Sequence, residues 1–85
     1  MYKVYWDEEA LKDLKNIDLA MAKKIISKVD NYLALDPKNL GKPLSSEFSG
    51  LFRYRFGNYR IIYEILEQNI QIIIVKVGHR SVVYD

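Results

Sequence analysis

Two runs of alternating apolar and polar residues flank the pair Gly57-Asn58 in the second half of the chain. Such runs, rich in aromatic and β-branched residues, are typical of β-strands, and a Gly-Asn pair between them predicts a hairpin with a two-residue type II′ turn. The turn also fixes the register of the two strands. The predicted pairs are Phe56 with Tyr59, Arg55 with Arg60, Tyr54 with Ile61, Arg53 with Ile62, and Phe52 with Tyr63.

The side chains of this hairpin separate into an apolar face and a cationic face, because successive residues of a strand point to opposite sides. Arg53, Arg55 and Arg60 occupy the cationic face, where the opposed pair Arg55 and Arg60 destabilises the sheet unless an anion lies between them. Guanidinium groups bind phosphate oxygens well. The alternative is that the exposed arginines simply point into water, apart from one another. The apolar face consists of Phe52, Tyr54, Phe56, Tyr59, Ile61 and Tyr63.

The N-terminal half predicts one strand and two helices. Residues 2–6 alternate and are aromatic or β-branched, which indicates a short strand. Asp7 is a typical N-cap, and apolar residues at helical spacing predict a helix of about three turns as far as Ile17. Asp18 offers a cap for a second helix, which ends before Pro37 because the residue preceding a proline is pushed out of helical conformations.

The remaining segments complete a small sheet. Residues 37–50 lack periodicity and contain proline, glycine and serine, which predicts a loop. Residues 70–77 are almost continuously apolar and predict a central strand after a three-residue turn at 67–69. In that register Lys76 pairs with Arg60, so cations from three strands form one row. A two-residue or four-residue turn breaks the row.

These elements predict an α+β fold in the order β-α-α-β-β-β, an antiparallel sheet with a helical hairpin packed on one face, in a single domain over residues 1–85. The chain is 49% hydrophobic, enough for one compact core, and the absence of cysteine excludes disulfides and cysteine chemistry. It has no apolar run of membrane-spanning length and does not begin with a secretory signal. The expected location is therefore the cytoplasm, with no membrane partner.

A net charge of +2 is too small to indicate nucleic-acid binding, but the distribution of the charge is more informative. All arginines lie at or after Arg53, whereas every lysine except Lys76 lies before residue 43. The last strand ends beside the hairpin turn, so we expect His79 and Arg80 to emerge next to the cationic row. The tail is short enough to bring Tyr84 to the same face; a disordered end is the alternative.

This set of side chains suits cleavage of an RNA phosphodiester without a metal ion. The arginines and Lys76 can bind phosphate, His79 can accept or donate a proton, and Tyr84 can stack on a base or assist proton transfer. The sequence offers no metal-ligand spacing and no phosphate-binding glycine loop, so no cofactor is expected. In RNA the 2′-hydroxyl can itself attack the adjacent phosphorus, which leaves orientation, proton transfer and charge neutralisation to the protein.

Five motifs stand out along the chain: YKVYW at 2–6, GKPL at 41–44, GLFRYR at 50–55, GNYRIIYE at 57–64, and VGHR at 77–80 with Tyr84. Together they resemble the RelE/ParE toxin superfamily over essentially the whole chain, most of all the RelE branch of type II toxin-antitoxin systems. The resemblance implies the same β-α-α-β-β-β layout and an mRNA interferase that cuts messages in the ribosomal A site. It also implies a partner, a small and acidic RelB-like antitoxin that wraps the toxin.

The resemblance also implies roles for individual residues. The three hairpin arginines hold and neutralise the phosphate, Arg80 stabilises or protonates the leaving oxygen, and Tyr84 stacks on a base. Well-studied members carry lysines at the positions of Arg53 and Arg55, and arginine is a poor general base because it stays protonated. His79 is therefore the candidate for general base or general acid.

Two alternative functions remain open. A ParE-like protein shares the fold but acts by binding DNA gyrase, and a non-catalytic nucleic-acid-binding module, or a toxin that has lost its activity, keeps the cationic face without cleavage. The arginine and tyrosine set is more nearly complete than ParE members usually show, which favours the ribonuclease.

Overall fold

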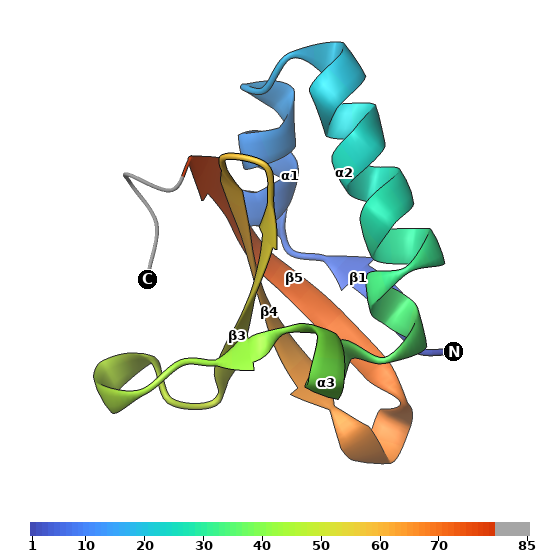
Figure 1. The fold of residues 1–85 in the computed structure, drawn as a ribbon, viewed down its shortest axis with the longest axis vertical. Coiled ribbons are helices and arrows are strands. Elements are labelled where there is room, and N and C mark those ends of the chain that lie inside the picture. The colour runs from blue at the N-terminus through green and yellow to red at the C-terminus, as the bar shows by residue number, and fades with distance from the viewer. Residues whose placement is uncertain (80–85) are drawn as a thin grey trace.

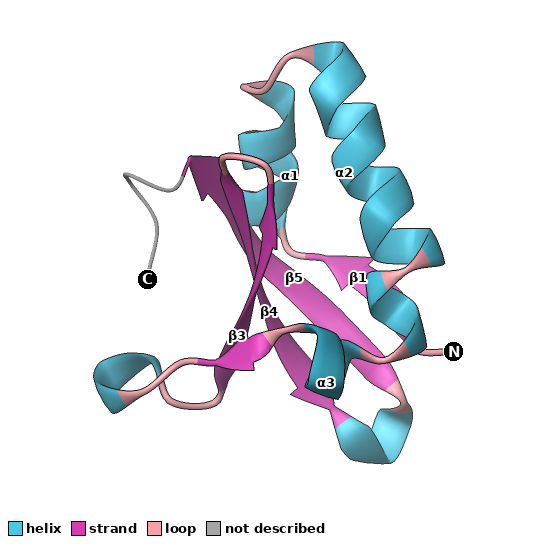
Figure 2. Ribbon diagram, viewed as in Figure 1, coloured by secondary structure: helices cyan, strands magenta, loops and turns pink. Residues whose placement is uncertain are grey.

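The structure of the chain is a computed structural model that describes residues 1–79 (Figure 1). Two helices cover one face of a twisted sheet, as the colouring by secondary structure in Figure 2 also shows. Among the described helices, none is long and apolar enough to cross a membrane. The helices are α1 (Glu8–Lys15), α2 (Leu19–Asn31) and α3 (Pro37–Leu40), with the short 3₁₀ helices η1 (Leu33–Leu35), η2 (Ser46–Phe48) and η3 (Glu67–Asn69). The strands are β1 (Lys3–Trp6), β2 (Lys42–Pro43), β3 (Leu51–Phe56), β4 (Tyr59–Leu66) and β5 (Gln71–His79).

The strands form one mixed sheet in the order β1-β5-β4-β3-β2. β1 runs parallel to β5, and all other neighbours are antiparallel. The predicted α+β class is confirmed, but the prediction of a wholly antiparallel sheet is wrong. β1 pairs with β5, the last strand along the chain, and not with β2, the next one. No hairpin turn therefore fixes the direction of β1.

The two long helices begin where the sequence predicts, because polar residues suit their first turns, but each ends before its predicted limit, α1 at Lys15 and α2 at Asn31. Asp7 precedes α1, and Glu8 and Glu9 lie at the positive end of its dipole. Asp18 precedes α2, and its carboxylate accepts a 3.3 Å hydrogen bond from the backbone N–H of Met21. Apolar residues at helical spacing then face the sheet. Those in the core are Ala10, Leu14, Ala22, Ile25 and Val29.

The aromatic face of the predicted hairpin lies against these helices, as expected. Phe52 stacks on Tyr63, with ring centroids 5.6 Å apart, and Tyr54 lies 6.2 Å from the ring of Tyr32 at the end of α2. Alternate residues of β4 and β5 complete the core. The buried sheet residues are Ile61, Tyr63, Ile72, Ile74 and Val77.

Residues 37–50 hold more regular structure than the predicted loop. Pro37 opens α3, where its missing N–H has no helical partner to lose, and β2 pairs with β3. The Tyr63 hydroxyl donates a 2.6 Å hydrogen bond to the carbonyl oxygen of Pro37, and Gly41 passes so close to that hydroxyl that a Cβ on Gly41 would overlap it. The loop prediction is wrong because elements this short have no periodic pattern and depend on tertiary contacts.

The connection between β4 and β5 is one residue longer than predicted. Leu66 pairs with Gln71, and Ile70, the fourth residue between them, is left-handed with a φ of 53°. A register shift between Ile62 and Tyr63 then changes the pairing again farther along the strands. The residues of β5 in the core are Ile72, Ile74 and Val77, whereas the register set by a three-residue turn would put Ile73 and Val75 on that face beside Val77.

Candidate functional site

The two-residue turn of the hairpin sets the cationic face of the sheet. Gly57 has a φ of 60° and the residue after it has no positive φ, as a type II′ turn requires. All five predicted pairs are confirmed, so Arg55 lies opposite Arg60 and Arg53 lies opposite Ile62. Because residues two apart on a strand share a face, the three arginines belong to the side of the sheet away from the helices.

The three arginines lie at different depths. Arg60, on the central strand β4, is only 5% exposed and is the one buried charged side chain among the described residues. Arg53 is half-buried, and Arg55 is exposed. Charges attract each other more strongly where water is excluded. The face therefore offers an anion one deeply placed guanidinium and two more accessible ones.

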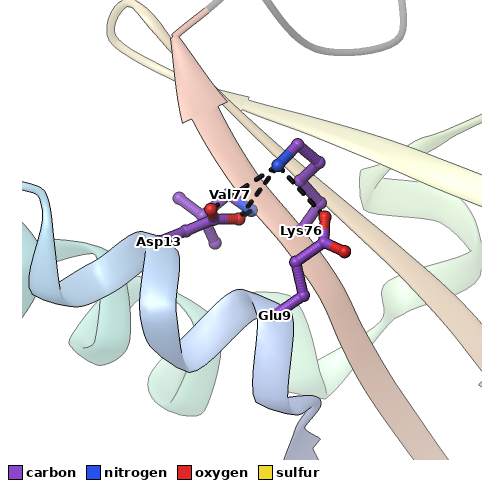
Figure 3. A network of polar contacts seen from close by, with 4 residues as sticks. All are labelled: Glu9, Asp13, Lys76 and Val77. Atoms are coloured by element: carbon purple, nitrogen blue, oxygen red, sulfur yellow. Dashed lines mark hydrogen bonds and ion pairs between the residues drawn. The ribbon is translucent and has the colours of Figure 1, made fainter.

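Lys76 does not join these arginines in a row across three strands. The residue opposite Arg60 on β5 is Gly78. The Lys76 ammonium instead lies 3.2 Å from the carboxylate of Glu9 and 3.5 Å from that of Asp13, both on α1 (Figure 3). The predicted row is therefore wrong, because the longer connection and the register shift displace β5 relative to β4.

Asp13 joins α1 to β5 at the point where β5 has no further partner on that edge. β1 ends at Trp6, opposite Ile74. Beyond that pair, the Asp13 carboxylate accepts a 2.9 Å hydrogen bond from the backbone N–H of Val77 (Figure 3). Burial of Lys76 disfavours its charged form, but the hydrogen bonds and charges of the two carboxylates outweigh this and raise the pKa of Lys76.

A further cation lies beside the arginines and was missed by the sequence reasoning. Lys42, on β2, is the cross-strand partner of Arg53. A shallow cleft of about 190 Å³ lies at this end of the sheet. The only available signal was the GKPL motif, whose lysine was assigned to a loop. The residues lining the cleft are Leu40, Lys42, Arg53, Tyr54 and Arg55.

His79 is the last residue of β5 and is exposed. It pairs with Tyr59, and the two rings meet edge to face with centroids 5.9 Å apart. Tyr59 belongs to the apolar face, so the imidazole contacts the rim of that face, although its backbone follows Gly78 beside Arg60. Arg80 and Tyr84, the other two predicted catalytic residues, lie outside the described residues.

Within residues 1–79, no group of three carboxylate or imidazole side chains could hold a metal ion. The charged groups of the candidate site are three arginines and one lysine on neighbouring strands, with one imidazole at the rim of the sheet. A phosphate placed over β3 and β4 would meet guanidinium groups that can bind two of its oxygens at once.

Nearly the whole chain matches a known family. The model of the family described as ParE toxin of type II toxin-antitoxin system, parDE, matches residues 4–84. Two toxins of Mycobacterium tuberculosis, RelG and RelE, are 30% and 31% identical to this chain over 83 residues. The alignments cover 98% of this chain and 95% and 86% of those toxins, respectively. The chain is a toxin of the RelE/ParE superfamily, on its RelE-like branch.

Solved structures agree with this membership. The RelBE2 toxin-antitoxin complex of M. tuberculosis contains a chain that matches this RelE-like toxin with a TM-score of 0.90 and 30% identity, over 94% of this chain and 92% of the other. The isolated E. coli RelE toxin matches with a TM-score of 0.75 over 93% of this chain and 84% of its own, at 17% identity, which shows a shared fold.

Proposed function

We propose that this RelE-like toxin is an endoribonuclease that cleaves mRNA in the ribosomal A site and so inhibits translation. The observation that carries the proposal is the confirmed pairing of Arg55 with the buried Arg60, with Arg53 on the same face of the sheet. The sequence similarity to toxins named RelG and RelE supports it.

In the proposed reaction the 2′-hydroxyl of one nucleotide attacks the adjacent phosphorus. The bond from phosphorus to the 5′ oxygen of the next nucleotide breaks as the bond to the 2′ oxygen forms. Arg53, Arg55 and Arg60 hold the phosphate and neutralise the charge that gathers on its oxygens. A base accepts the 2′ proton, for which His79 is the candidate, and an acid supplies a proton to the leaving 5′ oxygen, for which Arg80 is the candidate. Tyr84 stacks on a base.

Cleavage of a defined message in a purified translation system tests this proposal. We expect a downstream fragment that begins with a 5′-hydroxyl, because the leaving oxygen keeps no phosphate. A single 2′-O-methyl group at the cleaved nucleotide should abolish the cut. Arg60→Ala should lower the cleavage rate by at least about 100-fold, a typical loss for a group that stabilises transition-state charge. Lys23→Ala, on the exposed side of α2, is the matched control. A fragment with a 5′-phosphate would contradict the mechanism.

The pH dependence of cleavage tests His79 separately. A general base must lose its proton before it can act, so the rate should rise with pH, and the rise should depend on the imidazole of His79. His79→Gln should remove that rise. A pH profile unchanged by the substitution would exclude the role of base, while leaving the ribonuclease proposal in place.

The second candidate function is binding of DNA gyrase, because the matching family model is described as a ParE toxin. A supercoiling assay run beside the translation assay separates the two. Inhibition of supercoiling without cleavage of the message would favour the ParE-like activity. Neither effect, from a folded protein, would favour a non-catalytic nucleic-acid-binding module.

We also infer a protein partner, a RelB-like antitoxin, and action in the cytoplasm, where ribosomes are available. The M. tuberculosis RelBE2 and E. coli RelBE structures are toxin-antitoxin complexes, and both share this fold. Co-expression with a short reading frame adjacent to this gene should relieve growth inhibition and yield a complex that co-purifies. Persistent toxicity with every adjacent reading frame would contradict a locally encoded antitoxin.

A further inference from the structure

We propose that the cleft beside Lys42 binds a second phosphate of the RNA, adjacent in the strand to the phosphate that is cleaved. The inference rests on the proposed ribonuclease function and deepens it. Lys42, on β2, is then a substrate-binding residue. It takes the place beside the arginines that the sequence analysis predicts for Lys76 on β5.

The charges in the cleft favour an anionic ligand. Lys42 lies opposite Arg53, so two cations face each other across β2 and β3, just as Arg55 and Arg60 do across β3 and β4. An anion placed between two cations that face each other on neighbouring strands is attracted by both of them. None of the described residues that line the cleft is acidic.

Lys42 and Lys76 differ in the polar contacts of their ammonium groups. The Lys76 ammonium is held by two carboxylates. Within residues 1–79, no hydrogen bond or ion pair engages the exposed side chain of Lys42, and the same is true of Arg55. Both cations are therefore available to a ligand.

The size and place of the cleft favour one phosphate group. Its volume of about 190 Å³ lies below the range of roughly 300–1,000 Å³ typical of small-molecule pockets, so it suits a single group of a larger ligand. Neighbouring strands lie about 4.8 Å apart and residues along a strand about 3.4 Å apart, so Lys42, two strands and two residues away from Arg60, lies about 12 Å from it. A phosphate between Lys42 and Arg55 would therefore be separate from one bound over Arg60.

The segment that carries Lys42 is held in place before any ligand binds. The buried Tyr63 hydroxyl donates to the Pro37 carbonyl at one end of α3. At the other end, Gly41 lies against the same hydroxyl. A Cβ added to Gly41 would also lie only 2.9 Å from the backbone oxygen of Arg53. This packing fixes the start of β2, so its lysine is presented from a rigid backbone.

Binding of short non-cleavable RNAs tests the proposal. The probes are 2′-O-methyl dinucleotides, which contain a single phosphodiester, with no terminal phosphate, with a 5′-phosphate, or with a 3′-phosphate, titrated into the purified toxin. One of the two phosphates should raise the affinity by about three- to tenfold, as expected for one charge-assisted contact at a partly exposed site. Lys42→Gln should remove that gain, so that the variant binds all three probes alike. Lys42→Arg should keep the gain.

Lys23→Gln is the matched control, because it removes one exposed lysine from α2 and should preserve the gain. Lys42→Gln should also reduce the slope of log affinity against log salt by about 0.7, one contact's share for single-stranded nucleic acid. Equal binding of all three probes by the wild-type toxin, or a gain that survives Lys42→Gln, would overturn the proposal. Failure of the ribonuclease function itself would show differently, as a message left uncut by the wild-type toxin.

Discussion

Replacing Tyr63 by phenylalanine should destabilise the toxin through a single hydrogen bond. The ring of Tyr63 is fully buried and stacks on Phe52, and phenylalanine keeps that packing. The substitution removes only the hydroxyl that donates 2.6 Å to the carbonyl oxygen of Pro37. A buried acceptor that loses its donor costs about 1–3 kcal/mol. For a domain of this size, each kcal/mol corresponds to roughly 4–8 °C in melting temperature.

Urea unfolding followed by circular dichroism measures this loss. The midpoint should fall while the slope m stays constant, because the substitution exposes no new surface on unfolding. Tyr5→Phe is the control: that ring is 49% exposed, so its loss should stay within about 0.5 kcal/mol. Equal midpoints for Tyr63→Phe and Tyr5→Phe would refute the reasoning. Equal midpoints would mean that water or another donor binds the carbonyl oxygen of Pro37, and that the Tyr63 hydroxyl does not hold the segment that carries Lys42.

Three other outcomes are expected. Burial raises the pKa of Tyr63 well above 10.0. The free energy of unfolding should therefore fall as the pH rises past about 10, because only the unfolded state then releases the proton. A pH series of urea midpoints on wild type and Tyr63→Phe measures this fall, and the same pH dependence in both proteins would contradict it. Asp13→Ala removes the hydrogen-bond acceptor of the Val77 N–H and should lower the free energy of unfolding, measured by thermal unfolding, by about 1–3 kcal/mol. Glu9→Ala removes only one exposed partner of Lys76 and should lower it by less than about 1 kcal/mol. Gly41→Ala places a Cβ on the Tyr63 hydroxyl and should cost about 1–3 kcal/mol by the same assay, and a neutral result would show that α3 can shift freely.

The parts of the fold that the sequence predicts well are those fixed by local chemistry. The hairpin register follows from a turn in which Gly57 supplies the positive φ, so every pair between β3 and β4 could be written from the sequence. The cap at Asp18 and the spacing of apolar residues likewise define α2 from within that segment. These features need no knowledge of distant residues, and the three arginines of the candidate site depend on them alone.

The parts that the sequence predicts poorly depend on contacts between distant segments. Nothing local to residues 2–6 specifies that β1 runs parallel to β5. β2 is two residues long and exists because Tyr63 and β3 hold it in place. The turn after β4 carries a left-handed isoleucine, Ile70, a conformation that β-branched residues rarely adopt and that a sequence pattern does not indicate.

The displacement of β5 also explains which lysine remains available to a ligand. The predicted three-residue turn pairs Lys76 with Arg60, whereas the observed connection and register shift put Gly78 there. Because glycine has no side chain, β5 places no cation opposite Arg60. Lys76 meanwhile joins α1 to β5 through Asp13. In the proposed complex, the cation beside the three arginines is Lys42 on β2. An RNA strand that crosses the site should therefore run from β4 toward β2, and not toward β5.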